Sequence, residues 1–305
     1  MLGILGILVV FGAVVGGFLM EKGNLFVLLQ PAEVLIVVGA AVGIVLASNP
    51  ASGIHRMIRG AARSFRPSAH TRASVLRSLR MLYEVFAFTQ RAGANVLEEH
   101  IDDPENSPVF SNYHEFLNDP GYRAFVCDSL RMIAIGMTTP QELDQLMDLD
   151  IDVQRRSRQE LVTALSTVAD SLPGLGIVAA VLGVVITMQT IGAAPELVGQ
   201  KVAAALVGTF LGILLCYGVV GPLAARMETH GDGDAQLLQM LRTAVVAFAR
   251  GASPMLAVEY GRRSVPLELR PSFEEMEASI RRDARVPALA KPGDEEGKRG
   301  ADSAA

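Results

Sequence analysis

Two apolar stretches of the chain, residues 170–190 and 201–222, carry small and hydroxyl-bearing side chains at helical spacing. In the first stretch, one face holds Gly176, Ala180, Gly183, Thr187 and Thr190. In the second, one face holds Ala205, Thr209, Gly212 and Cys216. Such a face lets another helix approach closely, and its hydroxyl groups can help to solvate an ion or a neighbouring carboxyl group. The spacing is therefore compatible with plain helix packing and with a narrow ion path.

A proline stands at one end of each stretch, with Pro173 entering the first and Pro222 leaving the second. A proline removes one backbone donor and interrupts the hydrogen-bond ladder of a helix. Prolines are common near helix ends for that reason alone. The pair could also form two hinges that join motion in a membrane to motion outside it.

Ionisable side chains are missing from the middle of the apolar stretches, and Glu33 is expected at the membrane interface. Proton relays in bilayers usually depend on such groups. We therefore expect that the chain either does not conduct or meets a partner helix that supplies the acid.

The sequence shows no motif for nucleotide binding, metal binding or enzymatic catalysis. There is no phosphate-binding G-x-x-x-x-G-K-[ST] loop, and the five histidines form no H-E-x-x-H pair. We expect no enzymatic activity, no bound cofactor or metal and no nucleic-acid partner. The two cysteines, Cys127 and Cys216, are expected to be packing residues. Work must then come from an ion gradient or a partner.

The composition favours a membrane protein, because half of the residues are hydrophobic and only 19% are charged. Stretches of about 20 apolar residues can cross a bilayer. We expect an all-α integral membrane protein with four spans and a helical cytoplasmic domain built from the insert and the tail. The expected segments are two spans in residues 1–49, a helical insert in 50–169, the hairpin in 170–222, a helical tail in 223–285 and a disordered end in 286–305.

Arginine and lysine predict the orientation. The two short turns hold only Lys22 and Lys201, whereas every arginine lies in the insert or the tail. The positive-inside rule then places both termini in the cytoplasm. The first span lacks the features of a cleaved signal peptide, so we expect it to be retained. An arginine stripe at the start of the insert either lies on anionic lipid headgroups or only sets topology; its members are Arg56, Arg59, Arg63 and Arg66.

Within the insert, periodicity predicts helices over residues 72–100 and 122–135 and a third that starts at Pro140 and continues into the third span. After the fourth span, no helix breaker occurs until Gly231. In the tail, Ser272 and Glu275 have the spacing of a capping box.

Several longer motifs resemble one family. They are G-G-F-L-M, Q-P-A-E, D-S-L-P-G-L-G-I-V-A-A-V-L-G-V-V, V-G-T-F-L-G-I-L-L-C-Y-G, A-V-E-Y-G-R-R and R-P-S-F-E-E-M-E. Over about residues 1–285, the chain resembles the proton-driven MotA family of flagellar stator proteins.

The resemblance implies several copies of the chain around two helices of MotB, which brings a proton-binding aspartate and a cell-wall anchor. It assigns the ion path to Thr209 and Ala180, and Thr187 and Thr190 lie on the same small-residue face as Ala180. Sodium-driven relatives tend to have threonine where this chain has Ala180, which favours protons. The hinge prolines of the family match Pro173 and Pro222.

The family also has charged residues that engage the rotor protein FliG. Glu98 matches the acidic one, but Gln90 stands where the family has arginine, and Arg91 follows it. One residue turns a helical side chain by about 100°. Arg91 could serve, or a neighbour such as Arg77 or Arg80 could supply the charge.

We therefore expect a stator subunit of a bacterial inner membrane that couples inward proton flow to torque. Two alternatives remain open. One is an energiser of the ExbB/TolQ type, although such proteins typically have three spans. The other is a membrane scaffold that conducts nothing.

Overall fold

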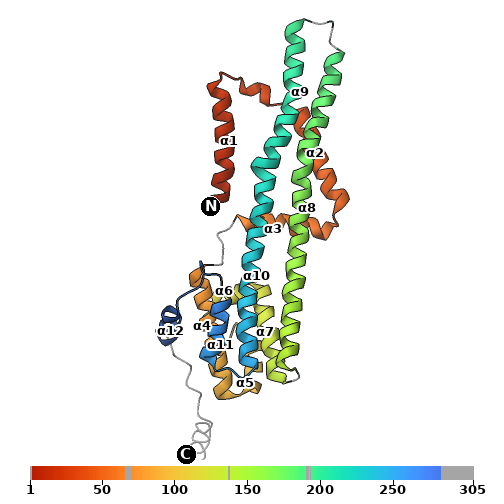
Figure 1. Cartoon of the computed structure of the whole chain (residues 1–305). Coiled ribbons are helices and arrows are strands. Elements are labelled where there is room, and N and C mark those ends of the chain that lie inside the picture. Colours follow the sequence, from red (N-terminus) through yellow and green to blue (C-terminus); the bar gives the residue numbers. More distant parts are fainter. Residues whose placement is uncertain (1, 66–70, 137, 190–191, 193, 283–305) are drawn as a thin grey trace, which may run out of the picture. The chain divides into compact units, whose positions relative to one another are not determined.

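The computed structural model describes residues 2–65, 71–136, 138–189, 192 and 194–282, and this part of the chain consists of helices and their connections without a strand (Figure 1). The helices in order are α1 Leu2–Met20, the short 3-10 helix η1 Leu25–Leu28, α2 Pro31–Ser48, α3 Ala51–Ser64, α4 Arg72–Ala92, α5 Ala94–Asp102, α6 His114–Asn118, α7 Pro120–Ile135, α8 Pro140–Met188, α9 Pro195–Leu215, the π-helix η2 Cys216–Val220, α10 Gly221–Ala249, α11 Pro254–Ser264 and α12 Phe273–Arg282.

Contacts divide the chain into two units. The first, which we call the span unit, contains Met1–Ala69 and Asp152–Asp234. The second, the insert–tail unit, contains His70–Ile151 and Ala235–Ala305. The middle of the insert and most of the tail therefore build one helical unit, whereas residues 50–69, 152–169 and 223–234 belong to the span unit. The segment boundaries expected at residues 49, 169, 222 and 285 refer to a membrane and stay predictions. The expected disordered end, 286–305, lies outside the described residues.

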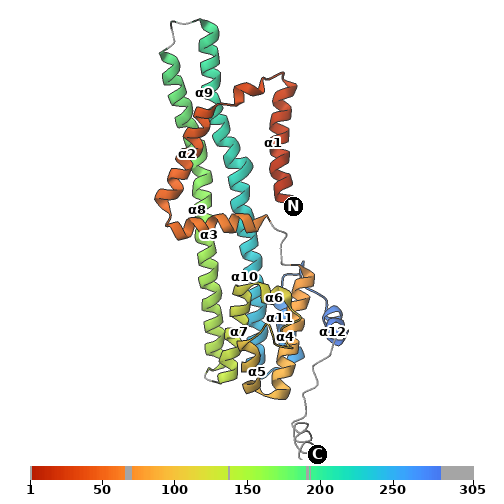
Figure 2. The same ribbon diagram turned by 180° about the vertical axis from the view of Figure 1, so that it is seen from behind.

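The span unit holds four segments that are long and apolar enough to cross a membrane. Two are α1 and α2, and the others lie in α8 and in the run from α9 to α10. In both views, α8 and α9 run side by side, and α3 crosses α8 and α10 (Figure 2). Met57 of α3 is buried there against Leu165 of α8 and Met227 of α10. The four-span prediction is confirmed.

The fourth span differs from the expectation at both ends. Helix α9 begins at Pro195, inside the stretch expected to be a turn, and α10 continues past Gly231 to Ala249. A single glycine costs a helix only about 1 kcal/mol relative to alanine, so it does not have to end one. At this point Arg158 of α8 also donates to the Gly231 carbonyl oxygen at 3.5 Å and pairs with Asp234 at 2.8 Å. These contacts hold the glycine-containing turn in place.

The helix expected over residues 72–100 is divided in two. Gly93 ends α4 with φ at 93°, a backbone region that glycine enters without steric cost. Helix α5 then begins at Ala94. The other two predicted helices of the insert are confirmed as α7 and as α8, which runs unbroken from Pro140 to Met188.

The insert–tail unit has a core of large side chains. Phe86 of α4 is fully buried and stacks on Phe248 of α10, with ring centroids 4.3 Å apart. Phe110 and Phe116 stack at 4.9 Å in the same core. Helix α5 packs on α7, and both α11 and α12 pack on α4.

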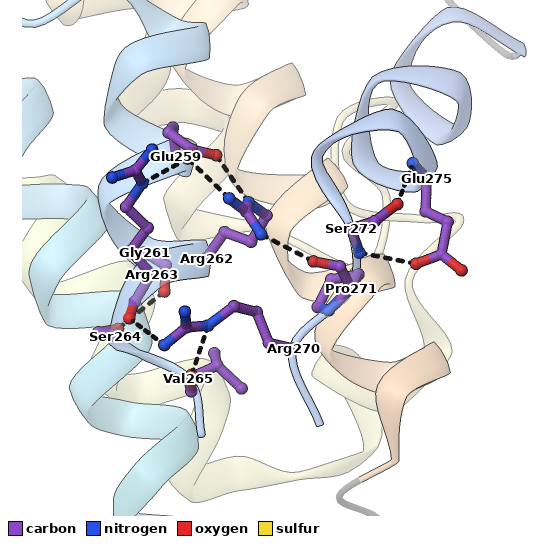
Figure 3. A network of polar contacts seen from close by, with 10 residues as sticks. All are labelled: Glu259, Gly261, Arg262, Arg263, Ser264, Val265, Arg270, Pro271, Ser272 and Glu275. Carbon is purple, nitrogen blue, oxygen red and sulfur yellow. Dashed lines mark hydrogen bonds and ion pairs between the residues drawn. The ribbon is translucent and has the colours of Figure 1, made fainter. Parts of the chain in front are cut away.

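Polar contacts fix the tail beyond α11 (Figure 3). Arg262 donates to both carboxylate oxygens of Glu259, at 2.7 and 2.8 Å, and to the Pro271 carbonyl oxygen at 2.9 Å. The hydrogen bond from Arg262 is the largest cause that lowers the pKa of Glu259. At the start of α12, the Glu275 amide donates to the Ser272 hydroxyl at 3.1 Å, and the Ser272 amide donates to the Glu275 carboxylate at 2.7 Å, which confirms the capping box.

Candidate ion path and rotor-facing residues

Glycines bring the backbones of α8 and α9 into direct contact. A methyl group added at Gly212 would lie 2.5 Å from the Leu172 carbonyl oxygen, and one at Gly176 would lie 2.7 Å from the Gly208 carbonyl oxygen. At Gly183 it would lie 2.6 Å from the Ala205 side chain. Distances this short exclude any side chain at these positions in the present packing. The predicted small-residue faces therefore meet each other within this chain.

The predicted ion-path residues lie along the same helix pair. The Thr209 hydroxyl donates across the pair to the Gly176 carbonyl oxygen at 3.3 Å. Thr187 is fully buried, and its hydroxyl donates to the Gly183 carbonyl oxygen at 2.8 Å. Ala180 is half-buried, and Thr190 lies outside the described residues. Ala180, Thr187 and Thr209 thus share one seam, and their role in ion transfer stays a prediction.

The two predicted hinge prolines have different surroundings. Pro173 lies inside α8, which continues through it. Pro222 is the second residue of α10 and follows the π-helix Cys216–Val220. In that widened turn, the Gly221 amide donates to the Cys216 carbonyl oxygen, and a methyl group at Gly221 would lie 2.8 Å from that oxygen. A π turn inside a helix often marks a functional site, so the backbone at Pro222 is locally altered where a hinge was predicted.

Glu33 is buried against the helix pair, which its place in the sequence does not indicate. It lies in the first turn of α2 and is only 7% exposed. Its carboxyl group fills a notch in the helix pair, where a methyl group at Gly208 would lie 2.5 Å from Oε2 and one at Gly183 would lie 3.4 Å from Oε1. Oε2 has no hydrogen-bond partner among the described residues. Glu33 lies in the first turn of α2, so its expected place at the membrane interface stays a prediction, whereas its enclosure by the helix pair was not predicted.

The predicted rotor-facing residues are exposed on the insert–tail unit. Gln90 and Arg91 lie in the last turn of α4, and Glu98 lies in α5. In the part of the chain that the structure describes, none of the three side chains forms an ion pair or hydrogen bond.

The alternative arginines have partners within the unit. Arg77 pairs with Glu115, and Arg80 pairs with Glu84 at 2.9 Å. Of the three arginines considered for rotor contact, Arg91 is therefore the one whose side chain has no partner among the described residues.

The arginine stripe lies on α3. Arg56 and Arg59 are exposed, with Arg56 donating to the Ser157 hydroxyl at 3.0 Å and Arg59 contacting the His55 ring at 2.9 Å. Arg63 is also exposed, and Arg66 lies outside the described residues. Contact of the stripe with lipid stays a prediction.

No group of three His, Cys, Asp or Glu side chains that could hold a metal ion occurs among the described residues. Cys127 and Cys216 are both buried and unpaired as thiols.

Comparison with protein families covers most of the chain. Residues 4–93 match the family described as Motility protein A N-terminal, and residues 119–240 match the MotA/TolQ/ExbB proton channel family. The chain is 37% identical over 281 residues to Motility protein A of Escherichia coli strain K12, which covers 92% of this chain and 95% of that protein. It is 33% identical over 273 residues to Chemotaxis protein LafT of Vibrio parahaemolyticus, with 90% and 96% covered.

Two solved structures share the fold. The structure of C. jejuni MotAB aligns with a TM-score of 0.74 at 18% identity and covers 88% of this chain and 98% of that chain. The flagellar MotAB stator complex from Bacillus subtilis aligns with a TM-score of 0.71 at 20% identity, with 90% and 97% covered.

Proposed function

Because this chain belongs to the Motility protein A family and is a stator subunit of that type, we propose that it couples inward proton flow to torque on a flagellar rotor together with a MotB-type partner. The observation that carries the proposal is the close pair of α8 and α9, which places the predicted ion-path residues on one seam. The family match over 92% of the chain supports the same role.

The partner and further copies of the chain would cover the spans. Only 22% of the most apolar part of α8, and none of the most apolar part of α1, is buried within this chain. Val178, Val181 and Val185 of α8 are among the exposed apolar residues. Exposed small and apolar helix faces associate with lipid or with other helices in a bilayer. Two related proteins were solved as MotAB complexes, which supports MotB-type helices as the occupants, with several copies of the chain around them.

Protons would pass between the seam and an aspartate of the partner helix. Thr209, Thr187 and Ala180 lie along this seam, and Thr190 is assigned to the same helix face from its spacing in the sequence. Ala180 favours protons over sodium. Hydroxyl groups can help to solvate a passing ion in a narrow path. The reaction would need no bound cofactor, because the proton gradient supplies the energy.

Torque would reach the rotor through the insert–tail unit. Pro173 and Pro222 would act as the hinges, and the π-helix before Pro222 supports that role. Exposed Glu98, Arg91 and Gln90 would contact FliG. This arrangement requires both termini and the insert–tail unit to lie in the cytoplasm of a bacterium, with the spans in its inner membrane.

Complementation tests the proposal. The chain and its MotB-type partner are expressed in a flagellated strain that lacks its own stator genes, and swimming speed is measured. We expect swimming to return, to stop with a protonophore and to persist without sodium. Swimming that never returns, although both proteins reach the membrane, would contradict the proposal.

The energiser alternative is tested with the same plasmids. The N-terminal match at residues 4–93 favours the stator, because it is specific to Motility protein A. A strain that lacks its ExbB/TolQ energisers should regain no iron-chelate uptake. Recovery of uptake without swimming would favour the energiser, and recovery of neither would favour a scaffold.

A further inference from the structure

A single carboxyl group is enclosed by the helix pair of the candidate ion path. Glu33 comes from α2, which starts beside α9, and its side chain enters the notch that Gly183 and Gly208 leave open. The side chain is 7% exposed, and Oε2 is without a hydrogen-bond partner among the described residues. The glycines are therefore needed for the carboxyl group as well as for helix contact.

The surroundings offer this carboxyl group no compensating charge. Within the described residues, no lysine, arginine or histidine forms an ion pair with Glu33. On the elements around the notch, the charged residues nearest to it in the sequence are exposed; they are Glu21 and Lys22 before η1, Asp170 on α8, and Glu196 and Lys201 on α9. An ionised carboxylate buried without a partner is far more costly than a neutral carboxyl group.

The notch also adjoins the seam predicted for the ion. Thr187 is fully buried one turn beyond Gly183, and its hydroxyl points at the Gly183 carbonyl oxygen. Ala180 lies on the other side, and its amide nitrogen is 3.4 Å from a methyl group built on Gly208. The notch that holds Glu33 thus lies next to Ala180 and Thr187, two of the predicted ion-path residues.

We propose that Glu33 is a proton-binding residue of this chain's ion path, which deepens the proposed stator function and rests on it. The neutral carboxyl group packs in the dry notch between Gly183 and Gly208. The ionised carboxylate requires water or a cation, so its formation loosens the seam at this point. Proton transfer is thereby coupled to the packing of α8 against α9.

The transfer step involves one proton and no redox change. An O–H bond forms at Glu33 when a proton arrives from the external side. That bond breaks when the proton passes, directly or through water, to the ionised aspartate of the partner helix. Glu33 is then a carboxylate again and the aspartate is neutral.

The test compares Glu33→Gln and Glu33→Asp in the complex of the chain with its partner. Motor torque is measured in cells, and proton flux is measured in vesicles. Glutamine keeps the size and neutral polarity of the packed carboxyl group but cannot release a proton. We expect Glu33→Gln to lower flux and torque at least tenfold with normal complex assembly, and Glu33→Asp to keep part of both with a shifted pH dependence. The control is Glu196→Gln, an exposed carboxyl group on α9, which should leave both unchanged.

Infrared difference spectroscopy provides a readout that does not depend on torque. The wild-type complex should show the carbonyl stretch of a protonated carboxyl group that Glu33→Gln lacks. A wild type that fails to drive the motor refutes the proposed function, and the infrared band still decides the proposal for Glu33. The proposal for Glu33 is overturned if Glu33→Gln keeps torque within twofold of wild type, or if the wild-type complex lacks the band. If Glu33→Gln does not assemble, an unshifted pH dependence in Glu33→Asp overturns it.

Discussion

The two units of this chain are each stabilised by a different kind of internal packing. In the span unit, glycines and alanines let α8 and α9 touch backbone to backbone, while large apolar side chains such as Val181 and Leu182 face outward. In the insert–tail unit, Phe86, Phe110 and Phe116 fill the interior. In lipid, large apolar groups gain little from burial, so close contact between helices is the main source of stability there. In water, burial of aromatic surface is the main source of stability. The difference identifies which unit meets lipid.

The largest expected effect concerns the seam of the span unit. Gly212→Ala places a methyl group 2.5 Å from the Leu172 carbonyl oxygen, which is backbone and cannot rotate away. We expect α8 and α9 to separate and swimming to be lost. Gly199→Ala, on the same helix with nothing within 4 Å of the added methyl, should swim normally. Equal swimming of both variants would show that the seam is not tightly packed.

The next effect concerns the aromatic core of the insert–tail unit. Phe86→Ala removes a fully buried ring stacked on Phe248. We expect it to lower the free energy of unfolding by about 3–5 kcal/mol. Thermal unfolding of the purified chain in detergent measures the change, and Phe273→Ala, at a ring that is 44% exposed, serves as the control. Similar losses in both variants would contradict a core centred on Phe86.

An ion pair of the same unit predicts a pH effect. The hydrogen bond from Arg262 holds the pKa of Glu259 below its usual range, so this bond stabilises the fold above about pH 4.3 and the contribution is lost as the pH falls below that value. Glu259→Gln should cost about 1.5–3 kcal/mol at neutral pH. It should also flatten the acid limb of the stability curve. Glu274→Gln, an exposed carboxyl group on α12, is the matched control, and an acid limb unchanged by Glu259→Gln would refute the assignment.

The smallest effect on stability belongs to a polar contact of the seam. Thr209→Val removes the hydrogen bond to the Gly176 carbonyl oxygen and keeps the shape of the side chain. Such bonds between membrane helices are worth about 0.6 kcal/mol. We therefore expect near-normal assembly, but reduced torque if the hydroxyl serves the ion path. Thr209→Ser should keep the torque, and full torque in Thr209→Val would remove Thr209 from the path.

Much of the fold could be predicted because its causes are local. The apolar stretches, the capping box of Ser272 with Glu275 and the start of α8 at Pro140 depend on residues near one another in the sequence. The continuation of α10 past Gly231 could not be predicted in this way. Arg158, which lies far away in the sequence, contacts this turn, and a single glycine costs a helix only about 1 kcal/mol.

The site shows the same limit. The small-residue faces were visible from spacing, but their mutual contact is a matter of three-dimensional packing. Glu33 follows a proline at the start of a helix, where an acidic residue usually faces water. Its burial depends on two glycines from other helices, Gly183 and Gly208, which remove the side chains that would otherwise occupy the notch. Local sequence contains no sign of that juxtaposition.

Proton flux into liposomes tests the central claim most directly. The purified chain is reconstituted alone and together with its MotB-type partner in open form, and the internal pH is followed after a gradient is imposed. We expect rapid acidification only when the partner is present, because the spans of this chain deliver protons to an acid on the partner helix. Equally rapid acidification by the chain alone would contradict it.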